Sequence, residues 1–162
     1  MMDEVYYDAD EEVFLLRRLK NCPEIFAAIA ESSNAALSSQ RKLRNEFDDD
    51  LVRAALSVHE ARRRAAGFLP HAEQLWMTRV GLEQSTAWDV AAHKAKRFSI
   101  SENVSDLCCG IGVDAAAIAA TTHVTAIDIE ASMCLRTEWN AEVWNRSSNL
   151  QTQCADVTDC DW

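Results

Sequence analysis

The chain has 162 residues, of which 48% are hydrophobic and 26% are charged, and its formal net charge is -10. This composition is typical of a globular protein with one core, and it argues against an intrinsically disordered chain. The negative charge repels polyanions at long range, so a non-specific nucleic-acid binder is disfavoured. No run of residues approaches the roughly 18 apolar residues of a membrane span, and the acidic start is unlike a signal peptide, so we expect a cytoplasmic protein without a membrane segment.

The first part of the chain predicts helices. Apolar residues recur with a helical period over residues 10–20, and Pro23 suits the first turn of a second helix. A long amphipathic helix is predicted from about 38 to 66, with Gly67 as its stop. The acidic triplet 48–50 lies between apolar positions of that helix, so we expect it to face solvent, at least in part.

A short extended or irregular link at residues 75–78 is predicted next, followed by a helix over 87–98. Thr86 and Asp89 have the spacing of a capping box, in which the threonine oxygen caps the helix start. The basic clusters 62–64 and 94–97 lie in predicted helices, where a solvated face is the simpler interpretation. His93 is interpreted in the same way, as a surface histidine.

Beyond residue 101 the pattern changes to alternating strands and helices. Strands are predicted at 104–109, 124–128 and 150–156, and helices at 114–120 and 131–144. Strand-helix-strand order with short links predicts an α/β doubly wound fold with a parallel sheet. We therefore expect a helical N-terminal domain at 1–75, a linker with a capped helix at 76–100, and an α/β domain at 101–162.

A glycine bend lies between the first predicted strand and its helix. Gly110 and Gly112 allow the backbone to turn sharply and allow a ligand to approach main-chain amides. Asp128 ends the second strand, about where an acid binds ribose hydroxyls in nucleotide sites. Gly110, Gly112 and Ala115 also satisfy the dinucleotide-binding fingerprint, which by itself is a weak signal.

Asp106 separates the two interpretations of this bend. A carboxylate at the end of the strand is costly beside a pyrophosphate unless it is paired. S-adenosylmethionine has no phosphate and carries a sulfonium and an ammonium group, which a carboxylate neutralises. The acid therefore favours S-adenosylmethionine over NAD.

At these residues the sequence resembles class I S-adenosylmethionine-dependent methyltransferases. The string from Asp106 to Gly112 is similar to their glycine-rich motif, with Cys108 in place of the usual first glycine. The resemblance implies that Asp128 binds ribose, and that Asp156 and the amide after it meet adenine. It implies a Rossmann-like methyltransferase sheet, of which the chain holds the first three strands. The complete set of predicted cofactor-binding residues is Asp106, Cys108, Gly110, Gly112, Asp128, Ile129, Asp156 and Val157; no catalytic residue and no metal site is predicted.

A narrower resemblance covers most of the chain; it is strongest from about Trp76 to Asp128 and weakest before Leu37. It is to bacterial methyltransferases with a THUMP-like domain and, more distantly, to trimethylguanosine synthases. It implies RNA as the acceptor, against the acidic charge, and it places residues 78–98 beside the cofactor pocket. Because the chain stops at Trp162, before the expected acceptor motif, we expect an incomplete methyltransferase domain. The alternatives are a non-catalytic binding or assembly module and an NAD-binding oxidoreductase fragment.

Other residues carry simpler predictions. The six cysteines form no C-x-x-C pair, so we expect reduced thiols. Cys108 and Cys109 are predicted to be small packing residues on opposite faces of the strand. Trp139 and Trp144 are predicted to be core or interface residues that later strands would cover. An incomplete sheet leaves an unpaired edge, which predicts a homodimer or aggregation.

Overall fold

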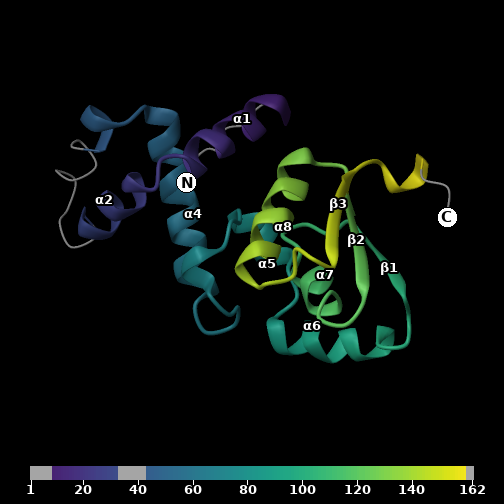
Figure 1. Cartoon of the computed structure of the whole chain (residues 1–162). Helices are drawn as coiled ribbons and strands as arrows, with labels where there is room; N and C mark the ends of the chain where they lie inside the picture. Colours follow the sequence, from purple (N-terminus) through teal and green to yellow (C-terminus); the bar gives the residue numbers. More distant parts are fainter. Residues whose placement is uncertain (1–8, 33–42, 160–162) are drawn as a thin grey trace. The chain divides into compact units, whose positions relative to one another are not determined.

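The computed structural model describes residues 9–32 and 43–159 of the chain (Figure 1). Contacts divide the chain into two compact units, residues 1–59 and 60–162, and each is described by itself. The domain boundaries expected after residues 75 and 100 stay predictions.

The described part of the first unit is helical, as the sequence predicts. Helix α1 spans Ala9–Lys20, α2 spans Glu24–Ser32, and α4, which continues into the second unit, spans Asp49–Ala65. The apolar faces of these helices supply its buried core, which includes Leu16, Leu19, Ile25, Ile29 and Val52. Acidic residues in the first turns of α1 and α4 and basic residues in their last turns complement the helix dipoles.

The prediction of one long helix from 38 to 66 is wrong in its first half. Residues 38–42 lie outside the described ranges, residues 43–46 are helical, and the chain then bends at Phe47 before α4 begins. The break falls at the acidic triplet because aspartate favours helix starts, and the Asp48 carbonyl accepts the first bond of α4, from the Val52 amide at 3.0 Å. All three aspartates are exposed, as expected.

The second unit is built on three strands and the helices that flank them. Its helices are α5 (Arg79–Gln84), α6 (Trp88–Ala95), α7 (Val113–Ile118) and α8 (Ala131–Val143). Short 3-10 turns are η1 (Ala72–Gln74), η2 (Lys96–Phe98) and η3 (Val157–Asp159). No helix in the described ranges combines the length and the apolar character that crossing a bilayer requires.

The sheet is parallel and follows chain order. Strands β1 (Asn103–Leu107), β2 (His123–Asp128) and β3 (Leu150–Cys154) lie side by side in the order β1-β2-β3 (Figure 1). The register pairs Asp106 with Ala126 and Asp128 with Cys154, so the carboxyl ends of the strands meet at one edge of the sheet. The predicted α/β architecture is confirmed.

One face of the sheet carries the helices. Val104, Val124 and Ala126 are on that face and belong to or pack against the apolar core, to which α7 and α8 contribute. On the other face, Asn103, Ser105 and the strand residues beside them are polar and largely exposed.

The segment before β1 differs from its prediction in two ways. Residues 75–78 form a link that is neither helix nor strand, as expected, but the six-residue helix α5 follows. It is capped by the Thr78 hydroxyl, which accepts from the Gly81 amide at 2.9 Å. Thr86 does not cap α6; the N-cap is Ala87, which makes no side-chain cap bond. The Thr86 hydroxyl donates instead to Asp114 at 2.7 Å, because a charged acceptor makes the stronger hydrogen bond.

Two tryptophans of the last helix are core residues, but later strands do not cover them. Trp139 meets Trp76 edge-on, with ring centroids 4.9 Å apart. Trp144 packs on Trp88 and donates its indole N–H to the Pro70 carbonyl at 3.0 Å. The cover therefore comes from the segment that precedes β1, which sequence periodicity could not show.

Candidate functional site

The bend between β1 and α7 has an unusual backbone. Cys108, Gly110 and Gly112 all have positive φ, at 60°, 55° and 79°. Cysteine rarely adopts this left-handed conformation, so the position where the resembled family has glycine keeps the glycine-like backbone. The predicted glycine bend is present and lies outside any helix.

The two glycines differ in what surrounds them. A Cβ on Gly112 would lie 2.6 Å from the Thr137 Cγ2 atom, so the close approach of the bend to α8 requires glycine there. A Cβ on Gly110 would meet no heavy atom within 4 Å. Gly110 therefore has open space beside its backbone, where a ligand could approach.

Asp128 at the end of β2 holds the bend. Its Oδ2 atom accepts from the Gly110 amide at 2.8 Å, and Oδ1 accepts from the Glu130 amide at 3.1 Å. The residue is only 9% exposed. Each carboxylate oxygen can accept a further hydrogen bond, so Asp128 can keep these contacts while it binds hydroxyl groups.

Helix α8 fixes the bend from the opposite side, through two residues that the sequence analysis missed. The Thr137 hydroxyl donates to the Gly110 carbonyl at 2.9 Å. One turn later, Asn140, with no exposed surface, donates to the carbonyls of Ile111 at 3.0 Å and Trp76 at 2.9 Å and accepts from the Trp76 amide at 2.7 Å. The available signal was a pair of polar residues three apart on the buried face of a helix.

Asp106 lies in the second-last position of β1, half-buried on the helix-bearing face. Burial, followed by the repulsion from Asp114, raises the pKa of its carboxyl group from 3.8 to about 6. The Ala115 amide and Lys94 act in the opposite direction and stabilise the anion. The net result is a carboxylate that would gain from a further cation.

Asp114 in the first turn of α7 connects the bend with α6. Its Oδ2 atom accepts from Lys94 and from the Thr86 hydroxyl, both at 2.7 Å. Its Oδ1 atom is buried and has no hydrogen-bond partner. The segment that contains α6 is thus tied to the glycine bend through Asp114.

The third predicted acid, Asp156, lies just beyond β3. Its Oδ1 atom accepts from the amide and the hydroxyl of Thr158 at 2.9 and 2.7 Å, and the amide contact lowers the pKa of the carboxyl group. The chain here is joined to β2 by the Ala155 amide, which donates to the Asp128 carbonyl at 3.0 Å. Ile129 is exposed and Val157 is half-buried in η3.

The adjacent cysteines of the bend do not share a strand, because β1 ends at Leu107. Cys108 is exposed, contrary to the prediction of a packing residue, while Cys109 is buried as expected. The left-handed backbone at Cys108 turns its side chain away from the core. Within the described ranges no three histidine, cysteine or acidic side chains gather as metal ligands would.

The basic cluster 62–64 is occupied by contacts within the protein, whereas in the cluster 94–97 Lys94 pairs with Asp114 and Lys96 and Arg97 are exposed. Arg62 is not a solvated residue: it donates to the Leu75 carbonyl at 2.8 Å, and burial lowers the pKa of its guanidinium to about 10. Arg63 and Arg64 pair with Glu60. His93 is exposed, as the simpler interpretation predicted.

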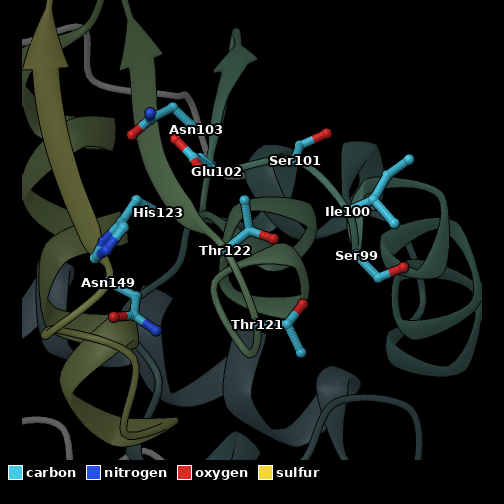
Figure 2. A pocket seen from close by; sticks show the side chains of 9 residues that line it. All are labelled: Ser99, Ile100, Ser101, Glu102, Asn103, Thr121, Thr122, His123 and Asn149. Atoms are coloured by element: carbon cyan, nitrogen blue, oxygen red, sulfur yellow. The ribbon is translucent and has the colours of Figure 1, made fainter.

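A shallow hollow of about 560 Å³ lies at the other end of the sheet (Figure 2). Its lining includes Asn103 and His123, the first residues of β1 and β2, and polar side chains that Figure 2 labels. It is therefore separated from the glycine bend by the length of the strands. We assign the site to the bend because neither the bend nor Asp106, Asp114 or Asp128 lines the hollow, whose one acidic side chain is that of Glu102.

Comparisons with known proteins bear on the fold. No protein-family model and no curated protein matches the chain. A solved structure from Porphyromonas gingivalis W83, described provisionally as a methyltransferase, aligns with a TM-score of 0.58 at 18% identity over 82% of this chain. This chain spans 35% of that protein's length. The likeness shows a shared fold.

Two further structures are more distant. The N-terminal domain of EvdMO1 with SAH bound aligns at a TM-score of 0.39 and 20% identity, over 64% of this chain and 48% of its own. Coclaurine N-methyltransferase bound to N-methylheliamine and SAH aligns at a TM-score of 0.42 and 18% identity, over 96% of this chain and 51% of its own. At these scores neither structure bears on the function of this chain.

Proposed function

We propose that this chain binds S-adenosylmethionine at the glycine bend and belongs to a methyltransferase. The observation that carries the proposal is the half-buried carboxylate of Asp106 beside the bend, whose anion is destabilised by burial and by Asp114. A ligand with a cationic end would remove that penalty. A dinucleotide would instead place negatively charged phosphates beside the same acids and would increase that penalty.

The residues present fit such a ligand. The space beside Gly110 admits a ligand to the backbone, and the buried Oδ1 atom of Asp114 is an acceptor without a donor. In this proposal Asp106 faces the ammonium and sulfonium end. Asp128 accepts from the ribose hydroxyls, and Asp156 with the Val157 amide meets the adenine.

The bound cofactor would supply a methyl group on a positively charged sulfur, which an acceptor nucleophile removes. The contribution of this chain is to orient that group and to exclude water. Cys108 and Ile129, both exposed at the same edge, would border the ligand. Thr137 and Asn140 hold the bend in its conformation from behind.

The acceptor is proposed from the sequence resemblance, which favours RNA. The net charge of -10 and the contacts of Arg62 to Arg64 reduce the basic surface for it. Binding should therefore be weak and should depend only shallowly on salt, because few phosphates would be neutralised. A cytoplasmic location is proposed on the free thiols of the described cysteines.

Calorimetric titration of the full chain with S-adenosylhomocysteine and with NAD tests the cofactor proposal. We expect heat with the first ligand and none with NAD; the reverse would favour the oxidoreductase, and no heat with either would favour a binding module. Asp128→Asn should weaken S-adenosylhomocysteine binding at least about tenfold, because the amide donates where an acceptor is needed. Asp89→Asn on the exposed start of α6 makes the same charge change and should not alter the affinity.

A further inference from the structure

Two thiols, those of Cys134 and Cys154, lie where β2, β3 and α8 meet, and the proposed cofactor contacts do not use them. The Cys134 Sγ atom in the first turn of α8 lies 3.4 Å from the Gln153 carbonyl and 3.6 Å from the Asp128 carbonyl. The Cys154 Sγ atom, at the end of β3, lies 3.5 Å from the Ile129 carbonyl. The Cys109 and Cys154 thiols both lie close enough to Cys134 to lower the pKa of its thiol.

We propose that Cys134 and Cys154 form a modification site, a thiol pair that a low-molecular-weight disulfide oxidises to an intramolecular disulfide. Their sulfurs lie within 3.6 Å of two consecutive main-chain carbonyls, those of Asp128 and Ile129. A disulfide bond forms when the two side chains bring their sulfurs from these neighbouring carbonyls to bonding distance.

The two thiols differ in access and in acidity: access favours Cys154 for the first step of an oxidation, and acidity favours Cys134 for the second. Cys154 is exposed, so a small oxidant can reach it, whereas Cys134 is buried. The neighbouring Cys109 thiol lowers the pKa of Cys134, and the place of Cys134 in the first turn of a helix also favours the thiolate. Burial and the neighbouring Cys134 raise the pKa of Cys154.

The reaction with glutathione disulfide balances as follows. The Cys154 sulfur attacks one sulfur of the oxidant and forms a mixed disulfide, and one glutathione thiol leaves. The Cys134 thiolate then attacks the Cys154 sulfur, forms the intramolecular disulfide and expels the second glutathione. The protein loses two electrons and two protons, and one glutathione disulfide becomes two thiols.

The disulfide should also affect the cofactor site, and this consequence rests on the proposed function. Forming it moves the Cys134 sulfur away from Cys109 in the glycine bend and removes its contact with the Asp128 carbonyl. Because Asp128 and the bend are bonded to each other, we expect weaker S-adenosylhomocysteine binding by the oxidised chain.

The test incubates the full chain, carrying Cys160→Ser, with glutathione disulfide and maps its peptides by mass spectrometry. Trypsin leaves Cys134 in peptide 98–136 and Cys154 in 147–162, and a further cut after Glu130 separates Cys134 from Cys108 and Cys109. A cross-link between the peptides with Cys134 and Cys154, reversed by dithiothreitol, is the expected result. In Cys134→Ser the reaction should stop at glutathione on Cys154.

Several outcomes overturn the inference. One is a mixed disulfide with glutathione that persists on Cys154 although Cys134 is present. Another is a disulfide between Cys109 and Cys134. The third is an unoxidised Cys154 in a sample whose Cys22 already carries glutathione. Cys22→Ser is the matched control and should leave the cross-link unchanged, since Cys22 belongs to the other unit. The mass readout needs no cofactor, so a chain that cross-links without binding S-adenosylhomocysteine would reject the proposed function alone.

Discussion

At the scale of single residues, replacing each of the two glycines of the bend by alanine should lower the free energy of unfolding by a different amount. Gly112→Ala combines a left-handed backbone with a Cβ 2.6 Å from Thr137, and we expect it to lower the free energy of unfolding by about 3 kcal/mol. Urea denaturation followed by circular dichroism measures this loss.

Gly110→Ala is the matched control because its φ is also positive and its Cβ has free space. It should cost about 1 kcal/mol, the backbone contribution alone. Equal losses for the two variants would show that the close approach of α8 to Gly112 does not constrain the bend.

Asp106 predicts a pH dependence of stability. Its folded pKa of about 6 lies above the unfolded value of 3.8, so the folded chain holds the proton more tightly between these values. Stability from this group is therefore present below about pH 4 and is lost as the pH rises through 6. Asp106→Asn should be about as stable as the wild type at pH 4 and more stable by about 2 kcal/mol at pH 7.5, measured by urea denaturation.

Asp156 should change stability with pH in the opposite direction to Asp106, and it therefore serves as the control. The Thr158 amide lowers its folded pKa, so the charged form stabilises the fold at neutral pH and the benefit is lost on acidification. Asp156→Asn should therefore destabilise the chain at pH 7.5 and have no effect at low pH. If Asp106→Asn also destabilises the chain at neutral pH, the carboxylate of Asp106 is satisfied within the protein and is not available for a cationic ligand.

At the scale of elements, α8 joins the segment before β1 to the glycine bend through Asn140. Asn140→Ala removes three hydrogen bonds and leaves buried carbonyl and amide groups without that partner. We expect a loss of about 3 kcal/mol in the free energy of unfolding. Asn149→Ala, which removes one bond to the Ala119 carbonyl, should cost about 1 kcal/mol in the same urea titration; similar losses would argue against this role of Asn140.

The elements that periodicity predicts well are those with repeated apolar positions. Helices α1 and α8 and all three strands lie within a few residues of their predicted bounds. The glycine bend and Asp128 could also be found, because left-handed turns and strand ends have residue-specific chemistry.

The misses have physical causes. Helix α5 has six residues, too few for an amphipathic pattern to show, and its cap, Thr78, preceded no apolar run. Thr86 had the spacing of a capping box, but its hydroxyl donates to the carboxylate of Asp114, which lies 28 positions away in the sequence. Thr137 and Asn140 bond to main-chain carbonyls that sequence reasoning could not place in space.

At the scale of the whole molecule, the net charge opposes self-association, whereas the unpaired edge of the sheet favours it. Among the described strands, β1 pairs only with β2, so one side of β1 is an edge. Leu107 on that strand is 46% exposed. We propose a homodimer through this edge, because an unpaired strand with an exposed apolar side chain favours pairing with another copy. The net charge of -10 on each copy opposes it.

Salt should therefore strengthen the dimer, since it screens the repulsion between two acidic copies. Sedimentation velocity across protein concentrations, at low and high salt, measures this. Ser105→Lys places a charge on the exposed β1 edge and should shift the chain toward the monomer. Ser57→Lys, at an exposed position of α4 in the other unit, makes the same charge change and should leave the association unchanged. Equal behaviour of the two variants, or a monomer at every concentration, would exclude association through β1.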